Sequence, residues 1–288
     1  MRLLQVLTDG LSNGSLYALV ALGFVLVYRS TKVLNFAHGE LLMVGAYFAL
    51  VLLVDLDLPY LLAVPAAIAG AGLVAWVLQR WVLRRLLDEE VFSVVLVTLG
   101  LSLILRSAVA FVFGVRERAL PAPVDTYVDV GPVNVWSVHL LAIGATVLVF
   151  ASVGMFYRRS RYGLAMRAMA SDQAVARLMG VSAFTVFGLS WLIAGGLAAV
   201  TGVLAGHTVF VSNNLGFVAI RALPAAVIGG LDSVRGALLG GLLLGMVEQL
   251  ASFYVGGETR ELAAFTALLL VLVVRPYGLF GTPEIKRV

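Results

Sequence analysis

The chain has 288 residues, of which 61% are hydrophobic and only 12% are charged. Ordinary soluble domains carry roughly a quarter charged residues, and a soluble domain of this size could not bury so much apolar surface. The composition therefore argues against a soluble protein and indicates an integral membrane protein. The net charge of +4 comes from basic residues that lie between apolar runs, which is typical of a membrane protein and not of one that binds nucleic acid. The sequence has no cysteine, which excludes disulfides and thiolate metal sites.

The apolar runs predict an all-α, polytopic membrane fold. A helix that crosses the hydrocarbon core needs about 20 mostly apolar residues. Candidate spans lie at 8–28, 36–54, 59–80, 91–113, 136–157, 184–210, 217–231, 234–254 and 261–277. The seventh is short and is expected to be tilted or only partly inserted, so we expect eight or nine transmembrane helices. No segment could form a separate soluble domain, and residues 1–288 are expected to form one transmembrane domain.

Lysine and arginine between the spans indicate the orientation, because cytoplasmic loops retain basic residues during insertion. If the N-terminus lies outside, most of the basic residues fall on the cytoplasmic side. The cytoplasmic set would be Arg29, Lys32, Arg80, Arg84, Arg85, Arg158, Arg159, Arg161, Arg167, Arg177, Arg235, Arg275, Lys286 and Arg287. The external set would be Arg2, Arg116, Arg118 and Arg260, while Arg106 and Arg221 fall within spans. This predicts a cytoplasmic C-terminus, an ordered external loop at 114–135 and a long cytoplasmic loop at 158–183.

Motifs for catalysis are not found in the sequence. The chain has two lysines, Lys32 and Lys286, and neither follows the glycine-rich loop that cradles phosphate in P-loop ATPases. The three histidines, His38, His139 and His207, are scattered singly, which argues against a metal site. We therefore expect no catalytic residues, no metal and no ATP site of the chain's own.

The 158–183 loop carries the strongest local signal. Ser171 and Asp172 are both good helix N-cap residues, and after them the chain reads QAVARLM. This predicts a short helix that ends at Gly180, a plausible C-cap, with Arg177 in its last turn where a cation suits the helix dipole. The preceding RYGLAMRAMA predicts a second helical stretch.

A plain solvated connector is the alternative interpretation of this loop. Against it, the loop holds five apolar side chains, Met166, Met169, Leu178, Met179 and Val181. These would suit a knob that docks into another protein.

Polar residues near the ends of apolar runs form a second group of candidates. Asn35, His38 and Glu40 stand at the start of the run that ends at Val54. Polar groups in lipid are costly and usually face a bundle interior or a water path. They would either cap and anchor a helix at its cytoplasmic end or line a translocation path. Further polar groups that a path could use are Asn13, Ser15, Glu248 and Gln249.

Four glycines are candidates for close helix packing. Gly236 with Gly240, and Gly241 with Gly245, form two pairs with the small-xxx-small spacing that lets helix backbones approach in lipid. Just before them, Pro224 and a Gly-Gly pair would interrupt a helix, which is consistent with a short seventh span.

Four stretches of the sequence carry a family resemblance. They are GLSNGSLYALVALGFVLVY at 10–28, NFAHGELLMVGAY at 35–47, ARLMGV at 176–181 and LPAAVIGGLDSVRGALLGG at 223–241, and they are spread over almost the whole chain. The sequence resembles the permease subunits of branched-chain amino acid ABC importers of the Liv type, and in particular the LivH-like member of each homologous pair. Relatives of this family for urea and short amides leave the substrate open.

The resemblance implies a set of partners and a location. The chain would form half of the translocation path in the inner membrane, and would pair with a second homologous permease, two cytoplasmic ATPases that bind ATP and an extracytoplasmic binding protein. The 158–183 loop would sit in a groove of the ATPase. ABC permeases often show Glu-Ala-Ala-x-x-x-Gly there, whereas this chain has Ala174, Val175 and Ala176 followed by Gly180, so that only the last alanine and the glycine match.

Two other functions compete with this interpretation. A secondary transporter driven by an ion gradient would place ionisable residues near the bilayer midplane, whereas Glu40 and Glu248 lie close to the ends of their spans. A structural membrane scaffold would not need polar residues at several helix ends.

Overall fold

The computed structural model describes residues 2–86, 89–130 and 133–282. Lys286 and Arg287, which were expected on the cytoplasmic side, lie outside the described residues. The helices are α1 (Arg2–Thr31), α2 (His38–Leu50), α3 (Tyr60–Trp81), α4 (Val91–Phe113), α5 (Ser137–Arg159), α6 (Arg161–Ser171), α7 (Gln173–Leu178), α8 (Ala183–Thr208), α9 (Phe217–Gly229), α10 (Val234–Tyr254) and α11 (Arg260–Val274). A π-helical turn (Val51–Asp55) extends α2, and two short 3₁₀ turns cover Leu83–Leu86 and Gly257–Thr259.

The all-α, polytopic prediction is confirmed, with one small exception. Within the described residues, seven helices are long and apolar enough to cross a membrane: α1, α2 with its π-helical extension, α3, α4, α5, α8 and α10. The predicted seventh and ninth spans correspond to α9 and α11, which have only 13 and 15 residues. The exception is a hairpin of strands β1 (Tyr127–Val130) and β2 (Val133–Trp136) inside the predicted external loop.

The described chain divides into two compact units. The first unit comprises residues 1–25, 124–146 and 220–288, and the second comprises 26–123 and 147–219. Each unit is therefore assembled from segments that are distant in sequence.

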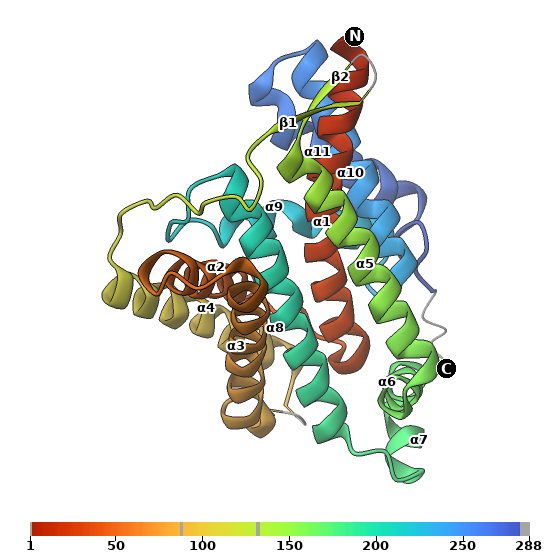
Figure 1. The fold of residues 1–288 in the computed structure, drawn as a ribbon. Helices are drawn as coiled ribbons and strands as arrows, with labels where there is room; N and C mark the ends of the chain where they lie inside the picture. Colours follow the sequence, from red (N-terminus) through yellow and green to blue (C-terminus); the bar gives the residue numbers. More distant parts are fainter. Residues whose placement is uncertain (1, 87–88, 131–132, 283–288) are drawn as a thin grey trace. The chain divides into compact units, whose positions relative to one another are not determined.

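Helices α2, α3 and α8 form the packed centre of the second unit (Figure 1). Their contact is close because small residues line it. A Cβ added to Gly45 would lie 2.4 Å from the Cα of Ala199, and one added to Gly202 would lie 2.1 Å from the carbonyl oxygen of Leu42. On α3, alanines recur every four residues and are fully buried: Ala63, Ala67, Ala71 and Ala75. Such stripes let helices pack by van der Waals contact where lipid removes the usual hydrophobic driving force.

Arg118 connects two other segments of the second unit through hydrogen bonds to Val211 and Asp55. Its backbone exchanges hydrogen bonds with Val211, and its guanidinium donates to both carboxylate oxygens of Asp55 at 2.5 and 3.2 Å. The hydrogen bonds to Asp55 raise the pKa of the Arg118 guanidinium above its ordinary value, so the pair stays charged.

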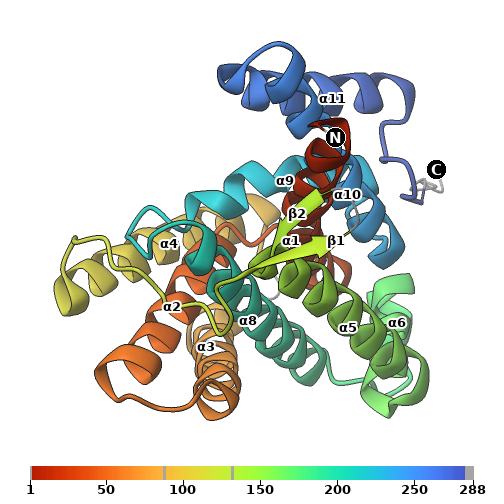
Figure 2. The same ribbon diagram turned by 45° about the horizontal axis from the view of Figure 1, so that its top comes forward.

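In the first unit, strands β1 and β2 lie next to each other (Figure 2). They form an antiparallel hairpin that pairs Tyr127 with Trp136. The Trp136 indole N–H donates to Asp125 at 2.8 Å, and the Ser137 hydroxyl donates to the carbonyl of Val124 at 2.6 Å. Helices α10 and α11 pack against each other in the same unit. The segment predicted as an ordered loop is therefore ordered by short strands.

Candidate functional site

The loop between α5 and α8 folds as two capped helices. The Ser160 hydroxyl accepts a hydrogen bond from the N–H of Gly163 and caps α6. Asp172 accepts from the N–H of Val175 at 3.0 Å and caps α7, whereas Ser171 is the last residue of α6. Of the two cap residues that the sequence left open, Asp172 is the one that caps this helix. Gly180 has φ +85° and lets the chain turn after α7.

The apolar side chains of this loop point to two different sides. Met166 and Met169 are 2% and 0% exposed, three residues apart on α6, which packs against α8. The expectation that they belong to a docking surface is wrong, because both side chains are buried within the second unit. Both helices also carry exposed apolar side chains: Tyr162 and Leu164 on α6, and Val175 and Leu178 on α7 with Met179 at its C-cap. We call Val175, Leu178 and Met179 the α7 patch; Leu178 is 87% exposed.

The beginning of α7 is tied to the end of α1. The side-chain amide of Gln173 donates to the carbonyl oxygen of Ser30 at 2.8 Å. One residue earlier on α1, the Arg29 guanidinium lies 5.4 Å from the ring centroid of Tyr157 on α5. Gln173 and Ser30 were not singled out from the sequence, because neither is part of a recognisable pattern.

The start of α2 is organised by Asn35, but not as a helix cap. The N-cap residue is Ala37, and it makes no side-chain capping hydrogen bond. The Asn35 side chain instead accepts from the N–H of Ala37 at 3.0 Å, and the N–H of Phe36 donates to the hydroxyl of Thr98 on α4 at 3.3 Å. The capping interpretation is therefore wrong in its geometry, because Asn35 fixes the turn that precedes the helix.

Glu40 forms an ion pair that the sequence analysis missed. Its carboxylate lies 2.5 Å from the guanidinium of Arg106 on α4, and the two side chains are 4% and 28% exposed. The guanidinium also lies 4.4 Å from the ring centroid of Phe217. Gly216 leaves the room that the pair needs, since a Cβ there would lie 2.8 Å from Glu40 Oε2. His38, the first residue of α2, is buried nearby in sequence with 1% exposure.

A second polar cluster lies in the first unit. The Tyr17 hydroxyl donates to Glu248 Oε2 at 2.7 Å, and both residues line a polar pocket of about 360 Å³. Asn13 is half-buried on α1, four residues before Tyr17 and so on the same face of the helix. At the rim of this pocket, Arg221 pairs with Glu261 at 2.9 Å.

The polar residues expected to line one path are thus divided between the units. Asn35, His38 and Glu40 belong to the second unit, and Asn13 and Glu248 belong to the first.

The four glycines of α10 contact two different helices in the first unit. A Cβ on Gly236 or Gly240 would lie 2.2 Å from a carbonyl oxygen of α9, that of Gly229 or Ala225 respectively. On the neighbouring face, added Cβ atoms would lie 2.3 Å from backbone nitrogens of α1: Gly241 faces Ala18, and Gly245 faces Gly14. Any side chain at these positions would push the helices apart.

Comparison with known proteins identifies relatives over the whole chain. The family described as "Branched-chain amino acid transport system / permease component" matches residues 6–274. The chain is 36% identical to the high-affinity branched-chain amino acid transport system permease proteins LivH of Salmonella typhimurium and of Escherichia coli K12, over 99% of this chain and 97% of each relative. It is also 36% identical to BraD of Pseudomonas aeruginosa, which carries the same description, over 99% and 98%.

A solved structure is similar in fold. PsaBC from Streptococcus pneumoniae, in complex with Fab, matches with a TM-score of 0.51 at 15% identity, over 96% of this chain and 93% of that one. At this identity the likeness concerns the fold alone.

Proposed function

Because the chain belongs to the permease-component family of branched-chain amino acid transport systems, we propose that it forms half of the path by which an ABC importer moves branched-chain amino acids or related small polar solutes. The chain is a multi-pass membrane protein and a transport subunit, not an enzyme. Its family has no ATPase domain of its own, and ATP is handled by partner ATPases.

The proposed assembly has four kinds of partner: lipid, a second homologous permease, two cytoplasmic ATPases and an extracytoplasmic binding protein. The observation that carries this proposal is the α7 patch. Val175, Leu178 and Met179 are 54%, 87% and 80% exposed on a short helix that is too polar at its ends to enter lipid. Exposed apolar side chains of this kind on a stiff element suit docking into a groove of a partner protein.

In this proposal, the α6–α7 segment couples the ATPases to the membrane helices. The coupling residues are Ser171, Asp172, Ala176, Arg177 and Gly180. Asp172 stiffens α7 as its cap, and Gly180 sets the turn into α8. The bond from Gln173 to Ser30 gives motion of α7 a direct connection to α1.

The proposed topology has the N-terminus outside and the C-terminus in the cytoplasm. The seven long spans, together with α9 and α11 as shorter crossings, give nine crossings, an odd number that fits this orientation. The basic residues of the α6–α7 segment support its cytoplasmic side. We also propose that the two units act as one permease domain, because α1, α5 and α9 each continue from one unit into the other.

The Glu40–Arg106 pair is the observation that would favour a transporter driven by an ion gradient. Ionisable residues within a span mark ion pathways in such proteins. Membership of the family supports transport driven by ATP hydrolysis instead. The following experiment distinguishes ATP-driven from gradient-driven transport.

The test is uptake of labelled leucine into proteoliposomes that contain the permease pair, the ATPases and the binding protein. We expect uptake that requires ATP and persists when proton and sodium gradients are collapsed. Unlabelled valine should compete, whereas urea and acetamide should not. Uptake that follows an ion gradient without ATP would contradict the proposed function, as would competition by urea alone.

A further inference from the structure

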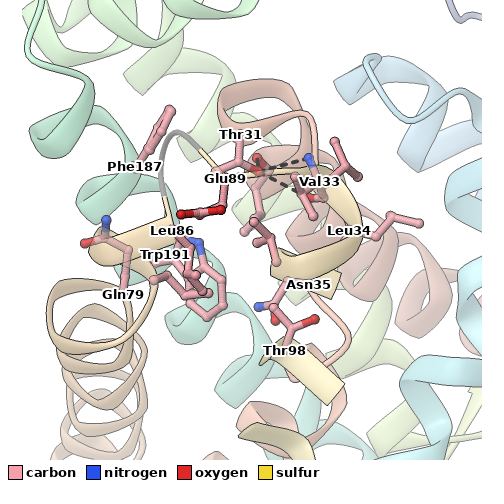
Figure 3. Close-up of a pocket in the computed structure, with 14 residues that line it drawn as sticks. Thr31, Val33, Leu34, Asn35, Gln79, Leu86, Glu89, Thr98, Phe187 and Trp191 are labelled. Carbon is pink, nitrogen blue, oxygen red and sulfur yellow. Dashed lines mark hydrogen bonds between the residues drawn. The ribbon is translucent and has the colours of Figure 1, made fainter. Parts of the chain in front are cut away.

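The second unit contains a partly open cavity of about 110 Å³ (Figure 3). Its walls come from the end of α1, the segment before α2, the end of α3 with the following 3₁₀ turn, the start of α4 and the start of α8. In the proposed topology all of these helix ends face the cytoplasm. The cavity would therefore be reached from the side on which the transported solute is released.

A buried amide in the wall has an unused hydrogen-bond donor. Asn35 is 2% exposed, and its Nδ2 has no hydrogen-bond partner among the described residues, while its Oδ1 holds the N–H of Ala37. Figure 3 shows the Asn35 side chain beside Thr98, facing the interior near Trp191. A buried polar group without a partner costs about 1–3 kcal/mol, so such groups are normally satisfied by a ligand or an ordered water.

Gln79 is a second buried amide in the same wall. It is 1% exposed, and neither of its amide atoms has a hydrogen-bond partner in the described part of the chain. In Figure 3 it lies on the other side of the Trp191 ring from Asn35. The cavity thus presents a donor and an acceptor on two sides of an apolar wall.

The rest of the lining selects the chemical class of the occupant. Phe187 and Trp191 of α8 and Val94 of α4 give apolar walls that suit an aliphatic side chain. Among the described residues that line the cavity, Glu89 is the only charged one, and it is exposed. Its carboxylate favours a molecule that carries a positive charge and disfavours a simple anion. An aliphatic α-amino acid combines an alkyl group, a carboxylate for the Asn35 amide and an ammonium group.

We propose that this cavity binds an aliphatic α-amino acid from the cytoplasmic side, and that occupancy slows the transport cycle. The assignment of an amino acid as the ligand rests on the proposed function, because an amino acid is then what the transporter releases into the cytoplasm. The proposed effect on the transport cycle is inferred from the residues of α1 in the cavity wall. Val27 and Thr31 of α1 line the cavity, and between them Ser30 accepts the hydrogen bond from Gln173 of the coupling segment. An occupant would hold this end of α1 in place.

The first test is equilibrium binding of labelled leucine to the purified complex in nanodiscs, without the binding protein. Asn35→Asp keeps the oxygen that accepts from Ala37 but replaces the unused N–H donor with a carboxylate oxygen. We expect leucine to bind at least about tenfold more weakly in this variant, because a hydrogen bond to a charged group is lost. Val94→Phe, which fills the cavity, should also weaken binding.

The matched control is Asn213→Asp, the same substitution at another asparagine of the second unit. Asn213 bonds to Tyr47 and Gly114 and does not line the cavity. It should bind leucine like the unsubstituted complex. If the complex binds no leucine, or if Asn35→Asp and Val94→Phe bind it normally, the cavity holds water only and the proposal is overturned.

A second test concerns the negative charge of Glu89, the exposed carboxylate in the cavity lining. The keto acid 4-methyl-2-oxopentanoate has the leucine skeleton without the ammonium group, and we expect it to compete poorly. Glu89→Gln should reduce the difference in affinity between leucine and the keto acid. Glu90→Gln, at the next residue and outside the cavity lining, should leave that difference unchanged. An unchanged difference in Glu89→Gln would contradict the assigned ligand class.

The regulatory part is measured as ATP hydrolysis by the complex with increasing leucine and no binding protein. Hydrolysis should fall in the unsubstituted complex and stay constant in Asn35→Asp; a fall in both would overturn it. Leucine uptake with the binding protein is measured in parallel. If leucine is taken up but does not bind to the isolated complex, the proposed cavity site is wrong and the proposed function still holds. If leucine binds but is not taken up, the proposed function is wrong and the cavity site still holds.

Discussion

Glu40 and Arg106 show how single residues constrain this membrane protein. Each lies in a helix that is long and apolar enough to cross the bilayer, and each would be costly there alone. Their 2.5 Å contact joins α2 to α4, and the Phe217 ring covers the guanidinium. Removing either partner would therefore destabilise the second unit, because the remaining charge would stay in its span without a partner.

We predict that Glu40→Gln and Arg106→Gln each destabilise the protein by about 3 kcal/mol, the usual cost of breaking a buried ion pair. The double variant should lose much less than the sum, because no uncompensated charge remains. Thermal unfolding of the purified protein in detergent measures this. Additive losses in the double variant would mean that the two side chains act independently.

For single residues, the sequence identified which ionisable side chains lie within spans, but not which side chains they pair with. Glu40 could be recognised as an ionisable residue in an apolar run, and so could Arg106, yet nothing in their 66-residue separation pairs them. The signal that could have done so is physical: two opposite charges in spans each need a partner. The choice between Ser171 and Asp172 likewise depended on where α6 ends, which a run of helix-forming residues does not define.

Among the elements, α10 depends on its glycines for two contacts at once. Gly236 and Gly240 admit α9, and Gly241 and Gly245 admit α1. Such contacts involve backbone atoms, so they cannot relax by turning a side chain. Close approach of this kind is a main source of helix association in lipid.

We predict that Gly240→Leu destabilises the first unit by about 2 kcal/mol or more, because it forces α9 away from α10. Gly144→Leu on α5 is the control, since a Cβ there meets no atom within 4 Å in the part of the chain that the structure describes. Yield of the assembled complex and its thermal stability are the measurements. Equal yields for the two variants would contradict the packing account.

Most helices could be predicted from the length of the apolar runs, and the differences have physical causes. Helix α1 begins at Arg2 rather than near residue 8, because a helix can extend beyond the apolar run from which a span is predicted. Within this extended helix, the Asp9 carboxylate lies 3.4 Å from His139. The β1–β2 hairpin was missed because its strands have only four residues each. The two sides of the α6–α7 segment could not be told apart either, since Met169 and Met179 are equally apolar and only packing buries one of them.

For the whole molecule, orientation is the property on which the proposed function most depends. The α7 patch can meet a cytoplasmic ATPase only if the α6–α7 segment lies inside. Since the chain has no cysteine, single cysteines report sidedness without background.

We predict that Ser171→Cys reacts with a membrane-impermeant maleimide only after the cells are opened, and that Thr126→Cys beside the hairpin reacts in intact cells. Both positions are exposed. The reverse pattern would invert the topology and with it the assignment of the coupling segment.

The central claim is that the α6–α7 segment transmits ATPase motion to the permease, and Gly180 tests it most directly. A Cβ at Gly180 meets no atom of the described residues within 4 Å, so a substitution there acts through its φ of +85°. Valine in this left-handed conformation costs about 1–2 kcal/mol, whereas asparagine tolerates it. The measurement is ATP hydrolysis by the reconstituted complex with and without loaded binding protein. We predict that Gly180→Val assembles but loses the stimulation, together with uptake, and that Gly180→Asn retains both. Full stimulation in Gly180→Val would show that this segment does not couple the two.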